Sequence, residues 1–426
     1  MSVALAALLV ACVHFVQVQA VPSKQPQNSR GQLAQRLQRA KPPQSVPKNE
    51  PIFELPHRGC FYPDDAAFYN GTQRFMAKDL DPSLCTYIVV PCGKITEDGR
   101  LRLLNNRRDK DLFRDLNQYK KDFPNLKILL SVGGKERTNQ LSEMGDRAKG
   151  LETLALSAVK MLRYWKVDGL DIYWDWEVSA FRSDEVLIPT LLQILRQVFD
   201  QESVKGNKVR LILSTTLQEA SQTASINGPV TGAAADIVNA VSYDQGNTAF
   251  ATLSIAHHSP LFGGPMGTPS KVNMANVLEE WNRAGIPKSK LVAGIPMYGR
   301  GWLLENADEH YLGNPSSEDD LESAYTKSPG QWPFYEICQR IESDNATVED
   351  DKRIAASYAY TDAWWVGYNN QVTIRGKVKW VKENGFGGVY ASDVSQDDFM
   401  GACGVKNPLM NSIKEESSGT VQKGQA

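Results

Sequence analysis

Short apolar runs alternate with amphipathic stretches along most of the chain. The apolar runs have the length of buried strands and are bounded by turn residues. Between them, segments such as Leu151–Trp165 and Val186–Phe199 place apolar residues three and four apart, which predicts helices that pack on a sheet. We predict strands at Gly59–Tyr62, Thr86–Pro91, Ile128–Val132, Gly169–Trp176, Arg210–Thr216, Ile237–Tyr243, Leu291–Tyr298 and Gly385–Ala391.

Strands that alternate with helices favour the α/β class, and eight such units predict a (β/α)8 TIM barrel with a parallel core. We expect this barrel to span residues 51–413. The interval from 299 to 384, between the seventh and eighth strands, is too long for one helix and its loops. A small inserted subdomain is therefore expected there. In such a barrel the chemistry belongs at the carboxyl ends of the strands.

Both ends of the chain differ from this body. Residues 1–20 hold a short apolar run that ends on a small residue, which predicts a cleaved signal peptide; a buried N-terminal helix is the alternative. Residues 21–50 carry six basic side chains against one acidic residue, so we expect a disordered basic segment. It is either a solvated tail or an arm drawn to acidic surfaces. Residues 414–426 are polar and are expected to form a disordered tail.

Composition and charge exclude several other classes of protein. The chain has 426 residues, of which 42% are hydrophobic, and a net charge of −2. This near-neutral charge argues against nucleic-acid binding, and no internal stretch approaches the ~18 apolar residues of a membrane span.

A secreted, extracellular protein would pair its cysteines and accept glycans at the sequons of Asn70 and Asn345. Without Cys12, five cysteines remain, which fits two disulfides and one free thiol.

The densest chemical signal is the segment VDGLDIYWDWE, residues 167–177. Because side chains alternate along a strand, Asp171, Tyr173, Asp175 and Glu177 are expected to face the barrel interior together. Three carboxyl groups in one row predict that at least one has a raised pKa. A carboxyl group with a raised pKa can act as the general acid of a glycosidase. The alternative is a hydrogen-bonded polar plug inside the barrel.

Five motifs, in order along the chain, resemble family 18 glycoside hydrolases, the family of chitinases and chitinase-like lectins. The resemblance runs from Gly59 to Met410 and implies the same barrel fold, with an α+β insertion at about 303–370. It also implies disulfides Cys60–Cys85 and Cys338–Cys403, with Cys92 as the odd thiol. The motifs are LLSVGG at 129–134, DGLDI at 168–172, SYD at 242–244, HHSPLFGG at 257–264 and KLVAGIPMYGRGW at 290–302.

The resemblance implies catalytic roles for the strand-four motif. In the family the substrate's own acetamide attacks the anomeric carbon, the last Glu protonates the leaving oxygen, and the preceding Asp orients the acetamide. Aligned without a gap, this chain has Tyr173 in place of that Asp and Asp175 in place of the Glu. The shorter side chain would place its carboxyl oxygens roughly 1.5 Å further from the leaving oxygen. Misplacement of a catalytic group by ~1 Å can lower the rate about 100-fold. A second alignment inserts Tyr173 and Trp174 and makes Glu177 the acid.

Sugar-binding positions are partly kept. The resemblance implies that Tyr243 supports the acetamide and that Asp244, Tyr298 and Arg300 bind the sugar. Two aromatic platforms are missing, because Ser392 and Lys135 stand where the family usually has Trp. Sugars stack on aromatic rings, and Tyr390, on the same strand face as Ser392, is the expected partial substitute.

The position of the catalytic acid and two aromatic positions that would stack on sugar are altered in this chain. These changes favour a secreted chitinase-like protein that binds chitin or N-acetylglucosamine oligosaccharides and hydrolyses them weakly or not at all. One alternative is an active endochitinase that uses a retaining, substrate-assisted mechanism with Glu177 as the acid. Another is a structural component of extracellular matrix or cuticle. No cofactor or metal is expected, since no metal-ligand spacing links the histidines, which include His57, His257, His258 and His310, to a cysteine or carboxylate cluster.

Overall fold

The computed structural model of the chain describes residues 53–63, 66–69, 71–134, 137–147, 149–175, 184–218, 226–244, 254–264, 273–317 and 321–419. The predictions for the signal peptide and basic segment, and those for Asn70, Lys135 and Glu177, therefore lie outside the described residues. Asn345 is described and is exposed in the turn that follows a helix of the insertion. None of the described helices is both long and apolar enough to cross a membrane.

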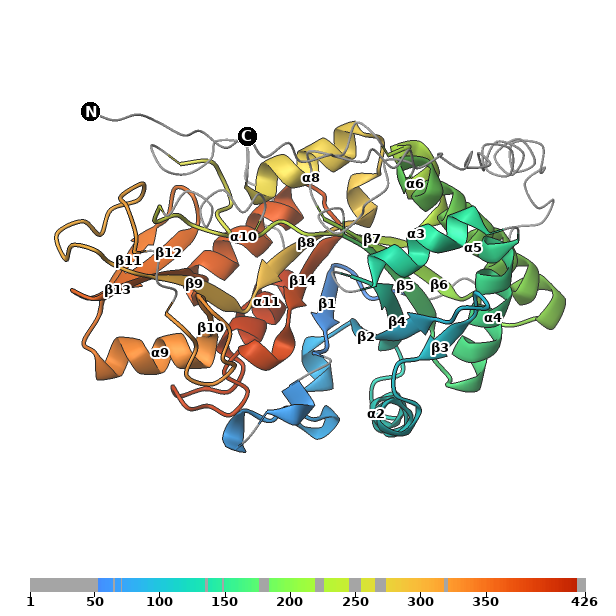
Figure 1. Cartoon of the computed structure of the whole chain (residues 1–426), viewed down its shortest axis with the longest axis horizontal. Coiled ribbons are helices and arrows are strands. Elements are labelled where there is room, and N and C mark those ends of the chain that lie inside the picture. The colour runs from blue at the N-terminus through green and yellow to red at the C-terminus, as the bar shows by residue number, and fades with distance from the viewer. Residues whose placement is uncertain are drawn as a thin grey trace, which may run out of the picture.

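Within the described residues, eight parallel strands close into a barrel (Figure 1). Closure is complete because the first strand pairs with both the second and the last. Every barrel strand overlaps one of the eight predicted strands, so the predicted fold is confirmed. The barrel strands are β1 (His57–Phe61), β2 (Tyr87–Ile95), β4 (Lys127–Gly133), β5 (Gly169–Trp174), β6 (Ile212–Leu217), β7 (Ile237–Ala240), β8 (Leu291–Pro296) and β14 (Gly388–Ser392).

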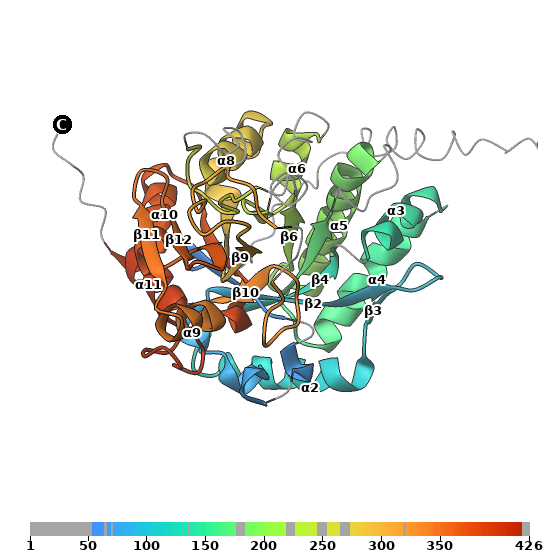
Figure 2. The same cartoon turned by 60° about the vertical axis from the view of Figure 1, so that its left-hand side comes forward.

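Helices surround the barrel, and a short strand, β3 (Leu101–Leu103), pairs antiparallel with the end of β2 (Figure 2). The two segments predicted as amphipathic helices lie in α4 and α5. Their apolar stripes are buried against the strands, as the spacing of apolar residues requires. The described helices around the barrel are α2 (Asn106–Tyr119), α3 (Thr138–Asp146), α4 (Gly150–Tyr164), α5 (Asp184–Gly206), α6 (Gly228–Ala234), α8 (Met274–Arg283), α10 (Gln371–Glu383) and α11 (Pro408–Ser418).

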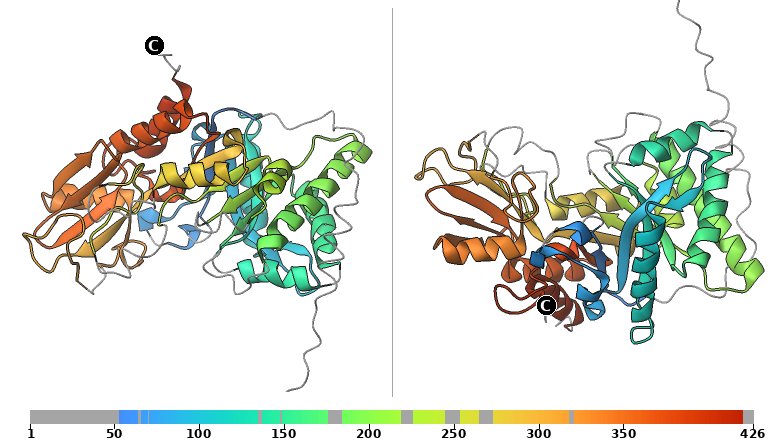
Figure 3. Two further views of the ribbon diagram at one scale, coloured as in Figure 1. Left: turned by 90° about the horizontal axis from the view of Figure 1, so that it is seen from above. Right: turned by 60° about the horizontal axis from the view of Figure 1, so that its bottom comes forward.

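The expected insertion forms a second sheet beside the barrel, between β8 and α10 (Figure 3). This antiparallel sheet starts at Tyr298 rather than at Leu303, because the chain passes from β8 through Met297 directly into the first strand of the insertion. Its described strands, in spatial order, are β10 (Gln331–Pro333), β9 (Tyr298–Leu303), β13 (Trp364–Tyr368), β12 (Ala356–Tyr360) and β11 (Thr347–Asp351), and α9 (Phe334–Ser343) belongs to the same unit.

The alternation of side chains along the strands separates two apolar clusters. The larger cluster lies between strands and helices and contains Ile172 and Trp174 of β5. The smaller one fills the barrel interior and contains Tyr87, Leu129 and Tyr243. Asp171, between Ile172 and Leu170, is on the interior side and fully buried. Asp171 therefore faces the barrel interior as predicted, and Ile172 and Trp174 lie on the opposite side of β5, against the helices.

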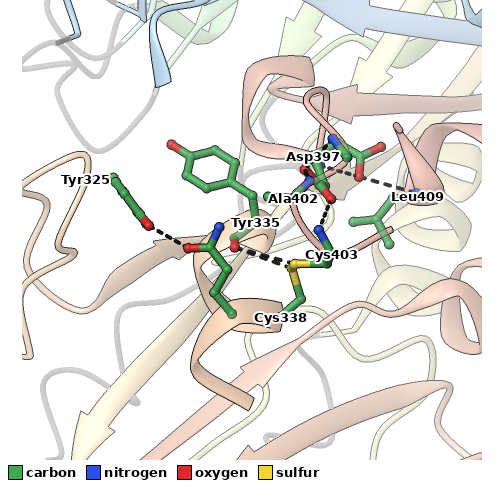
Figure 4. Close-up of a disulfide and its surroundings, with 10 residues drawn as sticks. Tyr325, Tyr335, Cys338, Asp397, Ala402, Cys403 and Leu409 are labelled. Carbon is green, nitrogen blue, oxygen red and sulfur yellow. Dashed lines mark hydrogen bonds between the residues drawn. A yellow bond between two sulfur atoms is a disulfide. The ribbon is translucent and has the colours of Figure 1, made fainter. Parts of the chain in front are cut away.

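Both disulfides implied by the family resemblance are present. Cys60 on β1 pairs with Cys85 just before β2, and Cys92 on β2 is buried and belongs to neither disulfide. Cys338 on α9 pairs with Cys403 in the loop after β14, which ties the insertion to the end of the barrel (Figure 4).

A pair of buried carboxylates organises this loop. Asp398 accepts hydrogen bonds from the backbone N–H groups of Gly401, Ala402 and Cys403 at 2.8–2.9 Å. Asp397 accepts from the N–H groups of Leu409 and Met410 at the start of α11 (Figure 4). Carboxylates that satisfy free N–H groups stabilise loops and helix starts. The loop that carries Cys403 is thereby fixed to α11.

The expectation of a disordered tail from residue 414 is wrong for its first residues. Helix α11 continues to Ser418. The reason is tertiary packing: Met410, Ile413 and Ser417 are buried on one face of this otherwise polar helix. Residues 420–426 lie outside the described part of the chain.

Removing the Cys338–Cys403 disulfide should destabilise the fold. The bond closes a loop with a sequence separation of 65 residues, and a loop of that size corresponds to about 4 kcal/mol. We expect a Cys338→Ser/Cys403→Ser variant to lose about that amount in urea unfolding monitored by circular dichroism. Cys92→Ala, which removes a buried thiol that belongs to neither disulfide, is the control and should lose about 1 kcal/mol. Equal losses in the two variants would contradict the predicted contribution of this loop closure.

Candidate functional site

Asp171 lies inside the barrel and is held by hydroxyl groups from neighbouring strands. Ser131 of β4 donates to one carboxylate oxygen at 2.7 Å, and Ser214 and Thr216 of β6 donate to the other at 2.8 and 3.1 Å. The amide of Asn239 on β7 donates in turn to both Ser214 and Thr216. Burial raises the pKa of Asp171, although these hydrogen bonds oppose the rise.

This network matches the polar-plug interpretation for Asp171. The residue is fully buried, and each of its oxygens accepts a hydrogen bond from a side chain on an adjacent strand. A buried carboxylate satisfied in this way cross-links strands. Asp171 is the carboxyl group of this row whose pKa is raised, and the largest cause is burial rather than repulsion between carboxylates.

Tyr173 continues β5 without interruption. It pairs in register with Gly133 of β4 and with Thr216 of β6, and Trp174 pairs with the next residue of β6. Gly133 and Gly134 have positive φ angles of 107° and 80°. A Cβ atom on Gly133 would lie 2.1 Å from the Tyr173 carbonyl oxygen, and one on Gly134 would lie 3.3 Å from the tyrosine ring. The double glycine is therefore required for β5 to pass this close.

Asp175 follows directly after β5 at the carboxyl end of the barrel. It is 3% exposed, and its backbone N–H donates to the hydroxyl of Thr138 at 3.1 Å. Thr138 is the first residue of α3 and is itself fully buried. Asp175 thus lies at the expected end of the barrel but is covered in this structure.

Asp244, Tyr298 and Arg300 form one connected group at the rim. The Tyr298 hydroxyl donates to Asp244 at 2.6 Å, and the Arg300 guanidinium makes an ion pair with the same carboxylate at 2.5 Å. Burial alone would raise the pKa of Asp244, but Arg300 and these hydrogen bonds hold it below its ordinary value. Asp244 has a positive φ of 51° and donates its N–H to the carbonyl of His258. Three predicted substrate-binding residues are therefore in contact.

Tyr243 and Tyr390 meet inside the barrel above a glycine. A Cβ atom on Gly294 would lie 2.6 Å from the Tyr243 ring and 2.7 Å from the Tyr390 hydroxyl oxygen, so only glycine fits there. Burial raises the pKa of Tyr243 to about 12, which keeps its hydroxyl neutral. Tyr390 is 1% exposed and packs at 4.7 Å from the ring of Phe61. A sugar could stack on Tyr390 only after these neighbours move, so its predicted role as a platform finds no open surface here.

Sequence reasoning missed the residues that support the rim. His258 stacks on Tyr298 with ring centroids 5.4 Å apart, and burial lowers its pKa to about 4, so it is neutral near pH 7. The hydroxyls of Ser131, Ser214, Thr216 and Thr138 were missed as well. Strand alternation gives a signal for Ser131, Ser214 and Thr216, because each lies on an inward position of its strand. His258 lies in the HHSPLFGG motif, but the motif assigned it no role, and no local pattern marks Thr138.

A closed parallel barrel with polar residues gathered at the carboxyl ends of its strands is the architecture of a large class of enzymes and enzyme-like binding proteins. The sequence model of glycosyl hydrolases family 18 matches residues 59–397. The chain belongs to this family.

Relatives include active and inactive members. An endochitinase of Manduca sexta is 30% identical over 381 residues, which cover 85% of this chain and 68% of the relative. The Group IV chitinase of Ostrinia furnacalis, solved in complex with allosamidin, has a TM-score of 0.77 and 27% identity and covers 85% of this chain and 100% of its own. Human YKL-39, described as a pseudo-chitinase with retained chitooligosaccharide binding properties, has a TM-score of 0.77 and 25% identity, with coverages of 86% and 99%.

Replacing Arg300 should reverse the pH dependence that Asp244 contributes. In the native protein the pKa of Asp244 is below its ordinary value, so its stabilisation is present above about pH 4 and is lost as the pH falls through the lowered pKa. In Arg300→Met, burial is no longer opposed by the cation and the pKa of Asp244 rises. Stability should then decrease as the pH rises above about 4, with a loss of about 3 kcal/mol at pH 7.

Urea unfolding between pH 4 and pH 7 measures this effect. The control is Tyr298→Phe, which removes one hydrogen bond to Asp244 but keeps the cation. It should lose about 1 kcal/mol and keep the native sign of the pH dependence. If Arg300→Met loses the same free energy at pH 4 as at pH 7, the ion pair does not control the ionisation of Asp244.

Proposed function

We propose that this protein is a secreted chitinase-like lectin that binds chitin-type N-acetylglucosamine oligosaccharides at the barrel mouth and hydrolyses them weakly or not at all. The observation that carries the proposal is the unbroken pairing of β5 with β4 as far as Tyr173 and with β6 as far as Trp174. A two-residue insertion at 173–174 within a closed barrel would disturb this register. The pairing supports the alignment without a gap.

That alignment leaves the acid machinery incomplete. Tyr173 stands at the position of the carboxylate that orients the acetamide, and a phenol carries no charge near neutral pH. It cannot stabilise a cationic oxazolinium intermediate as a carboxylate does. Asp175 stands at the position of the proton donor, is one methylene shorter than Glu, and is 3% exposed. A general acid must reach the leaving oxygen, and both features oppose this.

The binding side of the site is better kept. Tyr243 and the connected group of Asp244, Tyr298 and Arg300 supply a hydroxyl, a carboxylate and a guanidinium at the carboxyl ends of the strands. Several polar groups that converge at a barrel mouth are typical of a ligand site. The binding reported for YKL-39, a relative described as a pseudo-chitinase, supports the same combination of properties here. The two disulfides and the exposed sequon Asn345 support secretion.

An active endochitinase with Glu177 as the acid is the second candidate. Its support is the 30% identity to an endochitinase of Manduca sexta. The two candidates differ in whether Glu177 carries turnover, and the hydrolysis experiment is designed on that difference.

Hydrolysis of a fluorogenic chitotrioside separates the candidates. We expect the native protein to show turnover at or near background, because the acid and the acetamide-orienting carboxylate are both altered. The double variant Tyr173→Asp/Asp175→Glu restores the family pattern in the ungapped alignment and should raise turnover by at least 100-fold over the native protein. Glu177→Gln is the control and should change nothing. Native turnover that disappears in Glu177→Gln would establish the endochitinase instead.

Binding of tetra-N-acetylchitotetraose should persist without turnover. We expect calorimetry to detect it for the native protein and to show a loss of roughly five- to tenfold in affinity for Tyr243→Phe, the value of one hydrogen bond. Tyr164→Phe, which changes a 75% exposed tyrosine on α4, is the matched control and should bind as the native protein does. Absence of binding in the native protein would leave a matrix role in place of the lectin.

A further inference from the structure

A groove runs along the outside of the barrel, away from the rim residues described above. It has a volume of about 770 Å³ and is lined by residues in or next to α2, β3 and α4. Figure 1 shows where these three elements lie. Two contacts hold its walls together. The backbone N–H of Leu101 on β3 donates to the Ser157 hydroxyl on α4 at 2.9 Å, and the Asn117 amide on α2 donates to the carbonyl of Trp165 at 3.1 Å. The groove is therefore a fixed feature of the fold.

The charge of the groove is of one sign. Among the described residues that line it, four are cationic and none is acidic: Arg100, Arg102, Lys110 and Lys160. Arg100 pairs with Asp98 at 3.2 Å, but the other three form no ion pair with any described residue. The whole chain has a net charge of −2, so this concentration is local. Cations gathered in a concave surface focus a positive potential and attract anions.

One wall of the groove is apolar and exposed. The spacing of Leu156, Lys160 and Tyr164 places them on one face of α4. Leu156 is 57% exposed and Tyr164 is 75% exposed. The ring of Trp165, which also lines the groove, meets the Tyr164 ring edge-on at 4.9 Å. Exposed aromatic and aliphatic surface beside polar groups marks a binding site, and a tyrosine face suits the apolar C–H face of a sugar ring.

We propose that this groove binds an acidic oligosaccharide, with Tyr164 under a sugar ring and Arg102, Lys110 and Lys160 on its sulfate or carboxylate groups. Its volume lies in the usual range for small-ligand sites, which suits a few sugar rings better than a flat membrane surface. The near-neutral charge of the chain does not favour nucleic acid. This site is separate from the barrel mouth and does not depend on the function proposed for the mouth.

The test is binding of a sulfated, uronic-acid-containing hexasaccharide and of its desulfated form, measured by calorimetry on the full chain. We expect the sulfated probe to bind, with affinity falling at least tenfold between 50 and 200 mM salt because cation–anion contacts are screened. The desulfated probe distinguishes sulfate from carboxylate recognition: equal affinity assigns the site to carboxylates, and weaker affinity assigns it to sulfates. No binding of either probe overturns the proposal.

Variants distinguish a specific binding site from nonspecific attraction by surface charge. Arg102→Gln/Lys160→Gln should lower affinity at least tenfold and flatten the salt dependence, whereas Tyr164→Ser should lower it about fivefold and keep the salt dependence. Lys379→Gln, on α10 and 64% exposed, is the control and should bind like the native protein. An equal loss of affinity in Lys379→Gln, or equal affinity for a single-stranded oligonucleotide of the same charge, would contradict the proposal.

Competition with tetra-N-acetylchitotetraose locates the site. We expect the sulfated probe to bind undiminished in its presence, and displacement would place the probe at the barrel mouth instead.

Discussion

A single buried carboxylate sets the geometry of the barrel mouth. Asp171 on β5 accepts hydrogen bonds from hydroxyls of β4 and β6, and the two β6 hydroxyls accept hydrogen bonds in turn from the amide of Asn239 on β7. A buried carboxylate without such partners would cost several kcal/mol, so the four strands are constrained to the register that satisfies it. Because side chains alternate along β5, fixing Asp171 also fixes the side of the strand that Tyr173 faces. Because the register of β5 is constrained in this way, catalysis depends on which side chains occupy the end of the strand.

The rim is shared between the barrel and the insertion. Asp244 follows β7, whereas Tyr298 and Arg300 lie on β9, the first strand to enter the second sheet. Their ion pair and hydrogen bond join the two units at the carboxyl ends of the barrel strands. Removing one partner would leave a largely buried charge without its counter-ion. The residues of this group are therefore structural as well as candidates for binding, which is why pH-dependent stability reports on them.

The sequence was sufficient for the repeating part of the fold but not for features made by distant contacts. The strands were predictable because each apolar run had the right length, and the disulfides followed from the family resemblance. The end of α11 at Ser418 was not, because its polar sequence is helical only through the packing of Ile413 and its neighbours. The burial of Tyr390 depends on Phe61 and Gly294, which lie far away in the chain. The groove between α2, β3 and α4 was not predictable either, because its walls come from segments that are separated in the sequence.

The insertion is joined to the barrel at several places, which limits how far it can move as a unit. The chain passes directly from β8 into β9, the Cys338–Cys403 disulfide links the insertion to the loop held by Asp398, and β9 contacts Asp244 at the rim. With these connections the insertion cannot rotate about a single hinge. A ligand bound beside the insertion would therefore not need this unit to close over it, which would spare the ordering cost of closure.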